Sequence, residues 1–131
     1  MINDFNDSGF EMKENIIKDK SFAFAVRIVR LYKHLKDDKK EFVLSKQILK
    51  SGTSIGAMVR EAEHAETKAD FIHKMAIAQK EANETIYWLE LLTETEYLSD
   101  VEFKSIIDDA SEIIRLITTI IKTTKSNLIN G

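Results

Sequence analysis

The sequence contains no cysteine and no proline, and only four of its 131 residues are glycine. The absence of cysteine excludes disulfide scaffolds, cysteine-ligated zinc sites and thiol chemistry. All-β folds need frequent turns, which draw on glycine and proline, so the scarcity of both residues argues against such folds. A chain of this length closes a single hydrophobic core, and we therefore expect one domain.

Long apolar runs are also missing. A membrane-spanning helix needs about 18 uninterrupted apolar residues, and even the stretch from Ile113 to Ile121 is interrupted by Arg115. The N-terminus carries acidic residues before its first lysine and no apolar run of signal-peptide length. We therefore expect a cytoplasmic protein without a membrane partner, and its net charge of -3 gives no global attraction to nucleic acid.

Apolar residues that recur every three or four positions predict four amphipathic helices. The first ends near Lys36, with Asp19 or Ser21 as its N-cap, and its apolar stripe is Phe22, Val26, Val29, Tyr32 and Leu35. The second begins near Glu41, and the third runs over residues 68–95 from a capping box at Thr67 and Asp70. A second capping box at Ser99 and Glu102 opens the fourth helix.

The short connections between these helices predict the fold class. Long amphipathic helices joined by two to six residues pack as antiparallel neighbours, which gives an all-α, up-down-up-down four-helix bundle. We expect the bundle to occupy residues 16–126, after a loose, flexible arm over residues 1–15 and before a frayed C-terminus over residues 127–131.

Several apolar residues fall outside the predicted stripes. They are Phe24, Ile28, Leu31, Leu49, Met58, Ile72, Tyr87, Trp88 and Leu91. Two interpretations stay open, because the helices of a small bundle can bury a broad apolar arc, and because an oligomer buries a second surface.

Charge is distributed unevenly along the chain. Residues 13–60 hold twelve Lys or Arg against five acidic residues, a balance of +7, whereas residues 61–112 hold four against fourteen, a balance of -10. The first helical hairpin is therefore basic and the second is acidic. If the basic hairpin of one subunit meets the acidic hairpin of the next, the contact is heterologous, and heterologous contacts that close form cyclic rings.

Six basic residues of the first two helices are candidates for binding RNA or a protein partner: Lys20, Arg27, Arg30, Lys46, Lys50 and Arg60. Phosphate contacts come mainly from Lys and Arg, so RNA is one candidate partner. The neighbouring subunit is the other candidate, and it would bury the same residues.

Gly52 and Gly56 lie inside the predicted second helix, where two glycines cost about 2 kcal/mol relative to alanine. Close packing against another helix, which small residues permit, is one explanation for them. The alternative is a protein partner or an RNA backbone lying against this flat patch between basic residues.

Motifs for catalysis and metal binding are weak. Glu61 and His64, and also Asp70 and His73, have the spacing of di-iron bundle ligands, but both pairs crowd one turn, and the first helix offers no carboxylate between residues 19 and 37. The neighbouring carboxylates Glu81 and Glu84, and the serines, lack recognisable catalytic partners. We therefore expect no enzymatic activity, no metal site and no cofactor.

The glycine-containing segment resembles part of a known family. Residues 50–62, KSGTSIGAMVREA, are similar to the family signature RS-x-x-SI-x-AN-x-x-EA, with Lys50 in place of Arg and Met58 in place of Asn. Residues 80–92, KE-x-x-ET-x-YWL-x-LL, resemble its second signature, and residues 24–32, FA-x-x-I-x-x-LY, match its first helix. The resemblance covers about residues 15–125 and is to the four-helix bundle protein family, also called the rRNA intervening-sequence protein family.

This resemblance implies a small bacterial bundle that assembles as a homopentameric ring. Members of the family are encoded within intervening sequences of large-subunit rRNA genes, and others stand alone in genomes. A related group serves as accessory proteins of diversity-generating retroelements and binds the reverse transcriptase and RNA through a basic surface. The family has no established catalytic residues, so the resemblance implies a non-enzymatic oligomeric scaffold or an RNA-binding accessory protein.

Overall fold

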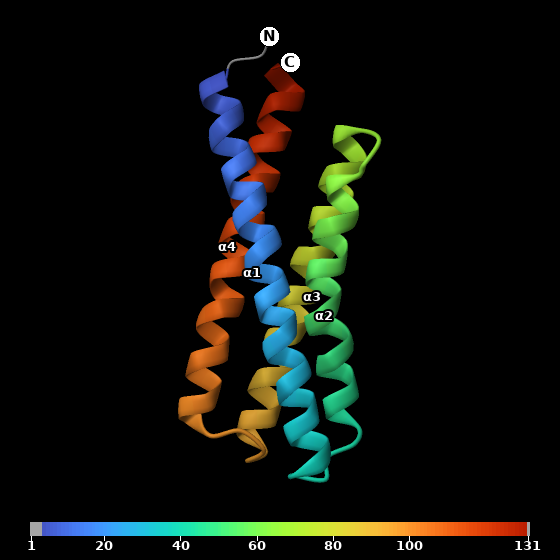
Figure 1. Ribbon diagram of the computed structural model, residues 1–131, viewed down its shortest axis with the longest axis vertical. Coiled ribbons are helices and arrows are strands. Elements are labelled where there is room, and N and C mark those ends of the chain that lie inside the picture. The colour runs from blue at the N-terminus through green and yellow to red at the C-terminus, as the bar shows by residue number, and fades with distance from the viewer. Residues whose placement is uncertain (1–3, 131) are drawn as a thin grey trace.

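The computed structural model describes residues 4–130, with side chains over residues 9–127. Within this range the chain forms four α-helices, α1 (Asp4–Asp37), α2 (Leu44–Glu63), α3 (Lys68–Glu94) and α4 (Asp100–Asn130), and no strands. Successive helices run in opposite directions, so the predicted up-down-up-down bundle is confirmed for a single chain (Figure 1).

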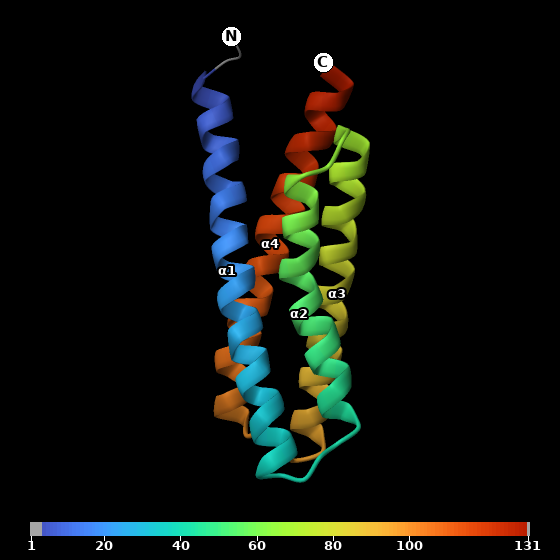
Figure 2. The same ribbon diagram turned by 45° about the vertical axis from the view of Figure 1, so that its right-hand side comes forward.

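Each helix packs against its neighbours in the sequence, and α4 closes the bundle by packing on α1. The other two pairs, α1 with α3 and α2 with α4, occupy diagonal corners and make no close backbone contact among the described residues. Both ends of the chain lie at the same end of the bundle as the α2–α3 connection (Figure 2). Because α1 and α3 both run away from that end, they are parallel to each other.

Side-chain caps begin two of the helices, as the sequence predicts. The amide of Asp70 donates a hydrogen bond to Thr67 Oγ1 at 3.0 Å, which caps α3. At α4 the capping box is reciprocal, because the Glu102 amide donates to Ser99 Oγ at 3.1 Å and the Ser99 amide donates to Glu102 Oε1 at 2.9 Å. Hydrogen bonding from the Ser99 amide, and then from the Ser99 side chain, lowers the pKa of the Glu102 carboxyl.

The predicted start of the second helix near Glu41 is wrong, since α2 begins at Leu44. Glu41 instead caps the helix from outside. Its buried carboxylate accepts hydrogen bonds from the amides of Ser45 at 2.7 Å and Val43 at 3.3 Å, and these amides have no partner inside the helix.

The N-terminal segment also differs from the prediction of a loose arm over residues 1–15. Helix α1 begins at Asp4, and Asp19 and Ser21, which we expected at its N-cap, lie well inside it. The Phe10 ring packs on the Phe71 ring of α3 with 6.1 Å between the centroids, so a tertiary contact supports helical turns that lack a strong apolar period. Residues 1–3 lie outside the described residues.

At the other end of the chain, α4 continues to Asn130, past the Asn127 position where we expect fraying to begin. Gly131 lies outside the described residues.

The core does not confirm the apolar stripe predicted for the first helix. Among the described side chains of α1, the buried apolar residues are Ile17, Phe24, Ile28, Leu31 and Leu35. Of the predicted stripe, only Leu35 is among them, whereas Phe22 is 57% exposed and Val26, Val29 and Tyr32 are half-buried. The helix carries two apolar stripes with the same period, and the prediction selected the wrong one.

The two glycines of α2 allow a close approach to α1. A Cβ atom at Gly52 would lie 2.7 Å from Ile28 Cγ1, and one at Gly56 would lie 3.4 Å from the Ser21 carbonyl oxygen. The first distance is an overlap and the second is an ordinary van der Waals contact, so helix packing explains Gly52 without an external partner.

Candidate interaction surfaces

Two of the six basic candidates join α1 to α4 within the chain. Arg27 Nη1 donates to Asp109 Oδ2 at 2.6 Å and to the Ser105 carbonyl at 3.2 Å, and its Nη2 donates to Ser105 Oγ at 2.9 Å. Lys20 Nζ lies 2.8 Å from Glu112 Oε1, and the hydrogen bond to this carboxylate raises the pKa of Lys20. Part of the charge difference between the two hairpins is therefore neutralised inside one chain.

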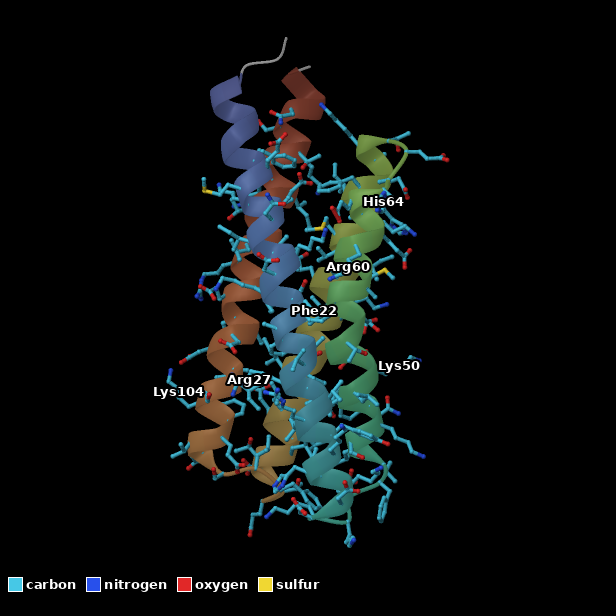
Figure 3. All side chains as sticks on the ribbon, in the orientation of Figure 1. Phe22, Arg27, Lys50, Arg60, His64 and Lys104 are labelled. Carbon is cyan, nitrogen blue, oxygen red and sulfur yellow. The ribbon has the colours of Figure 1, made fainter. Side chains whose placement is uncertain are left out.

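The other four basic candidates lie away from these ion pairs. Arg30, Lys46 and Lys50 are exposed and make no hydrogen bond or ion pair in the described part of the chain. Figure 3 shows Arg27 on the side of α1 towards α4, whereas Lys50 lies at the far side of the bundle on α2. The structure thus divides the six residues into a paired set and an unpaired set.

The outer side of α1 carries the second apolar stripe, formed by Phe22, Val26 and Val29 and called here the outer stripe. At 100° per residue its centre lies about 150° around the helix from the buried stripe. Arg30 and Lys33 lie beside it on α1, and Lys46 and Lys50 follow on the exposed side of α2. We call these four cations the basic rim.

Next to the outer stripe, α1 and α2 enclose a shallow groove of about 290 Å³. Its lining is mostly small and apolar: Phe22, Ala25, Thr53, Gly56, Ala57 and Arg60. The Arg60 guanidinium lies 5.4 Å from the centroid of the Phe22 ring, a cation–π contact that holds an exposed aromatic in place (Figure 3).

The outer side of α3 has the opposite charge. Tyr87 is 55% exposed, and its ring meets the edge of Trp88 at a centroid distance of 5.0 Å. Trp88 Nε1 donates to Glu84 Oε2 at 3.3 Å, whereas Glu90 and Glu94 are exposed and make no ion pair in the described part of the chain. We call Glu84, Tyr87, Glu90, Leu91 and Glu94 the acidic surface.

Glu61 and Ser51, which were considered for metal binding and catalysis, have other contacts. Glu61 Oε1 pairs with Lys74 Nζ at 3.1 Å, an interaction that raises the pKa of Lys74. Buried Ser51 accepts a hydrogen bond from Thr85 Oγ1 at 2.9 Å and links α2 to α3. No cluster of three or more potential metal ligands occurs among residues with described side chains.

A cavity of about 170 Å³ lies between α1, α2 and α3 near the ends of the chain. Ile17, Val59, Phe71 and Met75 form its apolar lining, and Glu11, Glu14, Asn15, Lys18 and Glu63 form the polar part. Burial, together with the charges of Glu63 and Glu11, raises the pKa of Glu14. Lys18 Nζ pairs with Glu63 at 3.1 Å, so this acidic cluster is partly neutralised.

None of the helices in the described range is long and apolar enough to cross a membrane. The fold defines an antiparallel four-helix bundle with an apolar, basic outer side on α1 and α2 and an acidic one on α3. Residues 13–119 match the 23S rRNA-intervening sequence protein family, and the chain belongs to this family.

One solved structure with the same fold is a protein of unknown function from the S23 ribosomal protein family of Bacteroides thetaiotaomicron. It is 62% identical to this chain, with a TM-score of 0.84, and the match covers 84% of this chain and 98% of that one. No curated protein matches the chain.

Sequence reasoning did not find the complete surfaces. It placed Phe22, Val26 and Val29 in the core and did not single out Lys33, Glu90 or Glu94. One signal was available, because α1 carries two apolar stripes with the same spacing although a bundle helix needs only one.

Proposed function

We propose that this protein is a non-enzymatic, cytoplasmic scaffold that assembles with copies of itself into a closed ring. The observation that carries the proposal is the outer stripe of α1, where three apolar residues at helical spacing face away from the core of a single chain. Apolar stripes of this kind are found where a helix packs against a second element.

Charge complementarity supports a contact between unlike surfaces. The basic rim and the acidic surface both lack ion pairs to oppositely charged residues in the described part of the chain. A contact between the outer stripe of one subunit and the acidic surface of the next would pair the cations of the basic rim with the carboxylates of the acidic surface. Such a contact is heterologous, and heterologous contacts give rings when the rotation closes. Five subunits is the number that the family resemblance implies.

Charge reversal tests the proposal. In the first variant Arg30 and Lys33 are replaced by Glu, and in the second Glu90 and Glu94 are replaced by Lys. Each variant should be a monomer in light scattering, because it places like charges on both sides of the contact. One chain with all four changes should assemble again. Assembly of each variant to the wild-type mass would contradict a contact between these surfaces.

A second candidate function is RNA binding through α2 and the adjacent side of α1. One observation favours it, namely that exposed Phe22 lies beside Arg60, on the face that also holds Lys46 and Lys50. Aromatic rings stack on unpaired bases while nearby cations contact phosphates. Lys20 and Arg27 do not belong to this candidate, since α4 already pairs them.

The RNA candidate is tested by titrating structured RNA at several salt concentrations. Replacing Lys46 and Lys50 with Glu should weaken binding and reduce its salt dependence, because phosphate contacts release counterions. The matched control replaces Lys122 and Lys125, two exposed lysines of α4, with Glu and changes the net charge equally. Equal binding by both variants, or no binding by the wild type, removes this candidate.

A further inference from the structure

We propose that Tyr87 of one subunit packs against Val29 of the next subunit, beside Arg30 and Lys33, in a ring whose axis runs parallel to the helices. The inference rests on the proposed self-assembly and adds to it the pair of helices in contact and their register.

The register inside one chain follows from two contacts. The hydrogen bond between Ser51 and Thr85 places these residues at one level along the bundle. The overlap between a Cβ at Gly52 and Ile28 places the adjacent residue of α2 level with Ile28 on α1. Residues 28 of α1 and 84–85 of α3 therefore lie at about the same height.

This register puts the two candidate surfaces at the same level. Helices α1 and α3 are parallel, and each residue rises about 1.5 Å, so Tyr87 lies level with residues 30–31 of α1 and within about 3 Å of the height of Val29. Rotation about an axis parallel to the bundle leaves every height unchanged. Tyr87 of one copy thus reaches the height of Val29 in the next copy without any sliding.

The residues around the two positions have opposite charge. On α3, Glu84 precedes Tyr87 by one turn and Glu90 follows it by about one turn. On α1, Arg30 and Lys33 follow Val29 by one and four residues, and both are exposed. An aromatic ring with acidic neighbours would therefore meet an aliphatic side chain with basic neighbours, and a second copy of this chain is the occupant that supplies such a surface.

Engineered disulfides test the contact directly, because the native chain has no cysteine. The variant carries Val29→Cys and Tyr87→Cys, and it is oxidised at micromolar concentration and separated on a non-reducing gel. A disulfide needs Cα atoms within about 7 Å, and α1 and α3 are diagonal helices without close backbone contact. Any bond between the two positions must therefore join different chains.

The matched control carries Phe22→Cys and Tyr87→Cys. Phe22 belongs to the same exposed stripe, but it lies about 13 Å above the level of Tyr87 at 1.5 Å per residue. We expect covalent oligomers from the Val29 variant, ending at the mass of the native assembly, and monomers from the Phe22 control. Val29→Cys alone should not form dimers, since dimers would indicate a two-fold contact between α1 helices.

The outcomes separate the inference from the proposed function. If the Phe22 control forms cross-links and the Val29 variant does not, the proposed register is wrong, but self-assembly still stands. The same holds if neither variant forms cross-links although light scattering shows an oligomer. Dimers from Val29→Cys alone overturn the heterologous contact. A wild-type monomer at micromolar concentration, including one that binds RNA through the same surface, overturns both.

Discussion

Phe22 and Phe24 are two residues apart on α1, and each belongs to a regular apolar stripe, but only one of them is in the core. Phe24 is 1% exposed among the core side chains, whereas Phe22 is 57% exposed beside Arg60. The inner stripe forms the core of the bundle, whereas the outer stripe lies outside it. An apolar period therefore identifies a surface that is buried, but it does not show which partner buries that surface.

Replacing Phe24 or Phe22 with alanine should give the largest difference in stability between the core and the outer stripe. Phe24→Ala leaves a cavity in the core and should lower the free energy of unfolding by about 3–5 kcal/mol. Phe22→Ala should lower that of the isolated chain by less than about 1 kcal/mol, because its ring is mostly in water. Urea denaturation at equal, low protein concentration measures both. Similar losses for the two variants would show that the stripes are equivalent.

A charge in the outer stripe should abolish assembly without unfolding the chain. Val29→Asp places a carboxylate where a neighbouring subunit must bury an apolar surface, and burial of an unpaired charge is strongly unfavourable. Light scattering should therefore give the mass of one chain, while circular dichroism stays helical. Thr119→Asp, at an exposed position of α4, is the control and should keep the wild-type mass.

Arg27 is ion-paired within the chain and Arg30 is not, so the two arginines should contribute differently to stability and to assembly. Arg27→Met removes hydrogen bonds to Asp109 and Ser105 and should lower the free energy of unfolding by up to about 1 kcal/mol, a value limited by exposure to solvent. Arg30→Met removes no contact within the chain and should leave the stability of the isolated chain, measured at low protein concentration, unchanged while weakening assembly. Thermal unfolding and light scattering on both variants distinguish the roles. The reverse pattern would mean that the two arginines are assigned to the wrong sets.

The smallest expected effect concerns Glu14 in the cavity near the chain ends. Burial raises its pKa above the ordinary value of 4.5, so the ionised carboxylate destabilises the folded state at neutral pH. Protonation relieves this cost as the pH falls through the raised pKa towards 4.5. Glu14→Gln should thus stabilise the protein at pH 7 by less than about 1 kcal/mol, because Glu14 is only half-buried. The gain should vanish near pH 4.5, and a gain that persists there would point to another cause.

Much of the fold can be predicted from the sequence where the signal is local. Thr67, Ser99 and Glu102 cap helices with their own side chains, so their spacing predicted the starts of α3 and α4. The predicted start of α2 is three residues early, because Glu41 caps the helix from a position before the N-cap residue Val43. The first turns of α1 depend on a tertiary contact between Phe10 and Phe71.

The candidate site was less predictable for a related reason. The charges of Lys20 and Arg27 are visible in the sequence, but their pairing with α4 depends on how the bundle closes. The two apolar stripes of α1 have the same spacing, so the sequence does not show which one faces outwards. The close packing of Ile28 against Gly52 determines the rotation of the helix in the bundle. Residue types thus predicted the kind of surface, and packing decided its position.

The proposed self-assembly is tested most directly by the mass of the wild-type protein in solution, measured by light scattering at micromolar concentration in low and moderate salt. We expect a single closed oligomer whose mass is a fixed multiple of 15.0 kDa. The family resemblance implies that the multiple is five. A wild-type mass of 15.0 kDa under both conditions would contradict the proposed self-assembly.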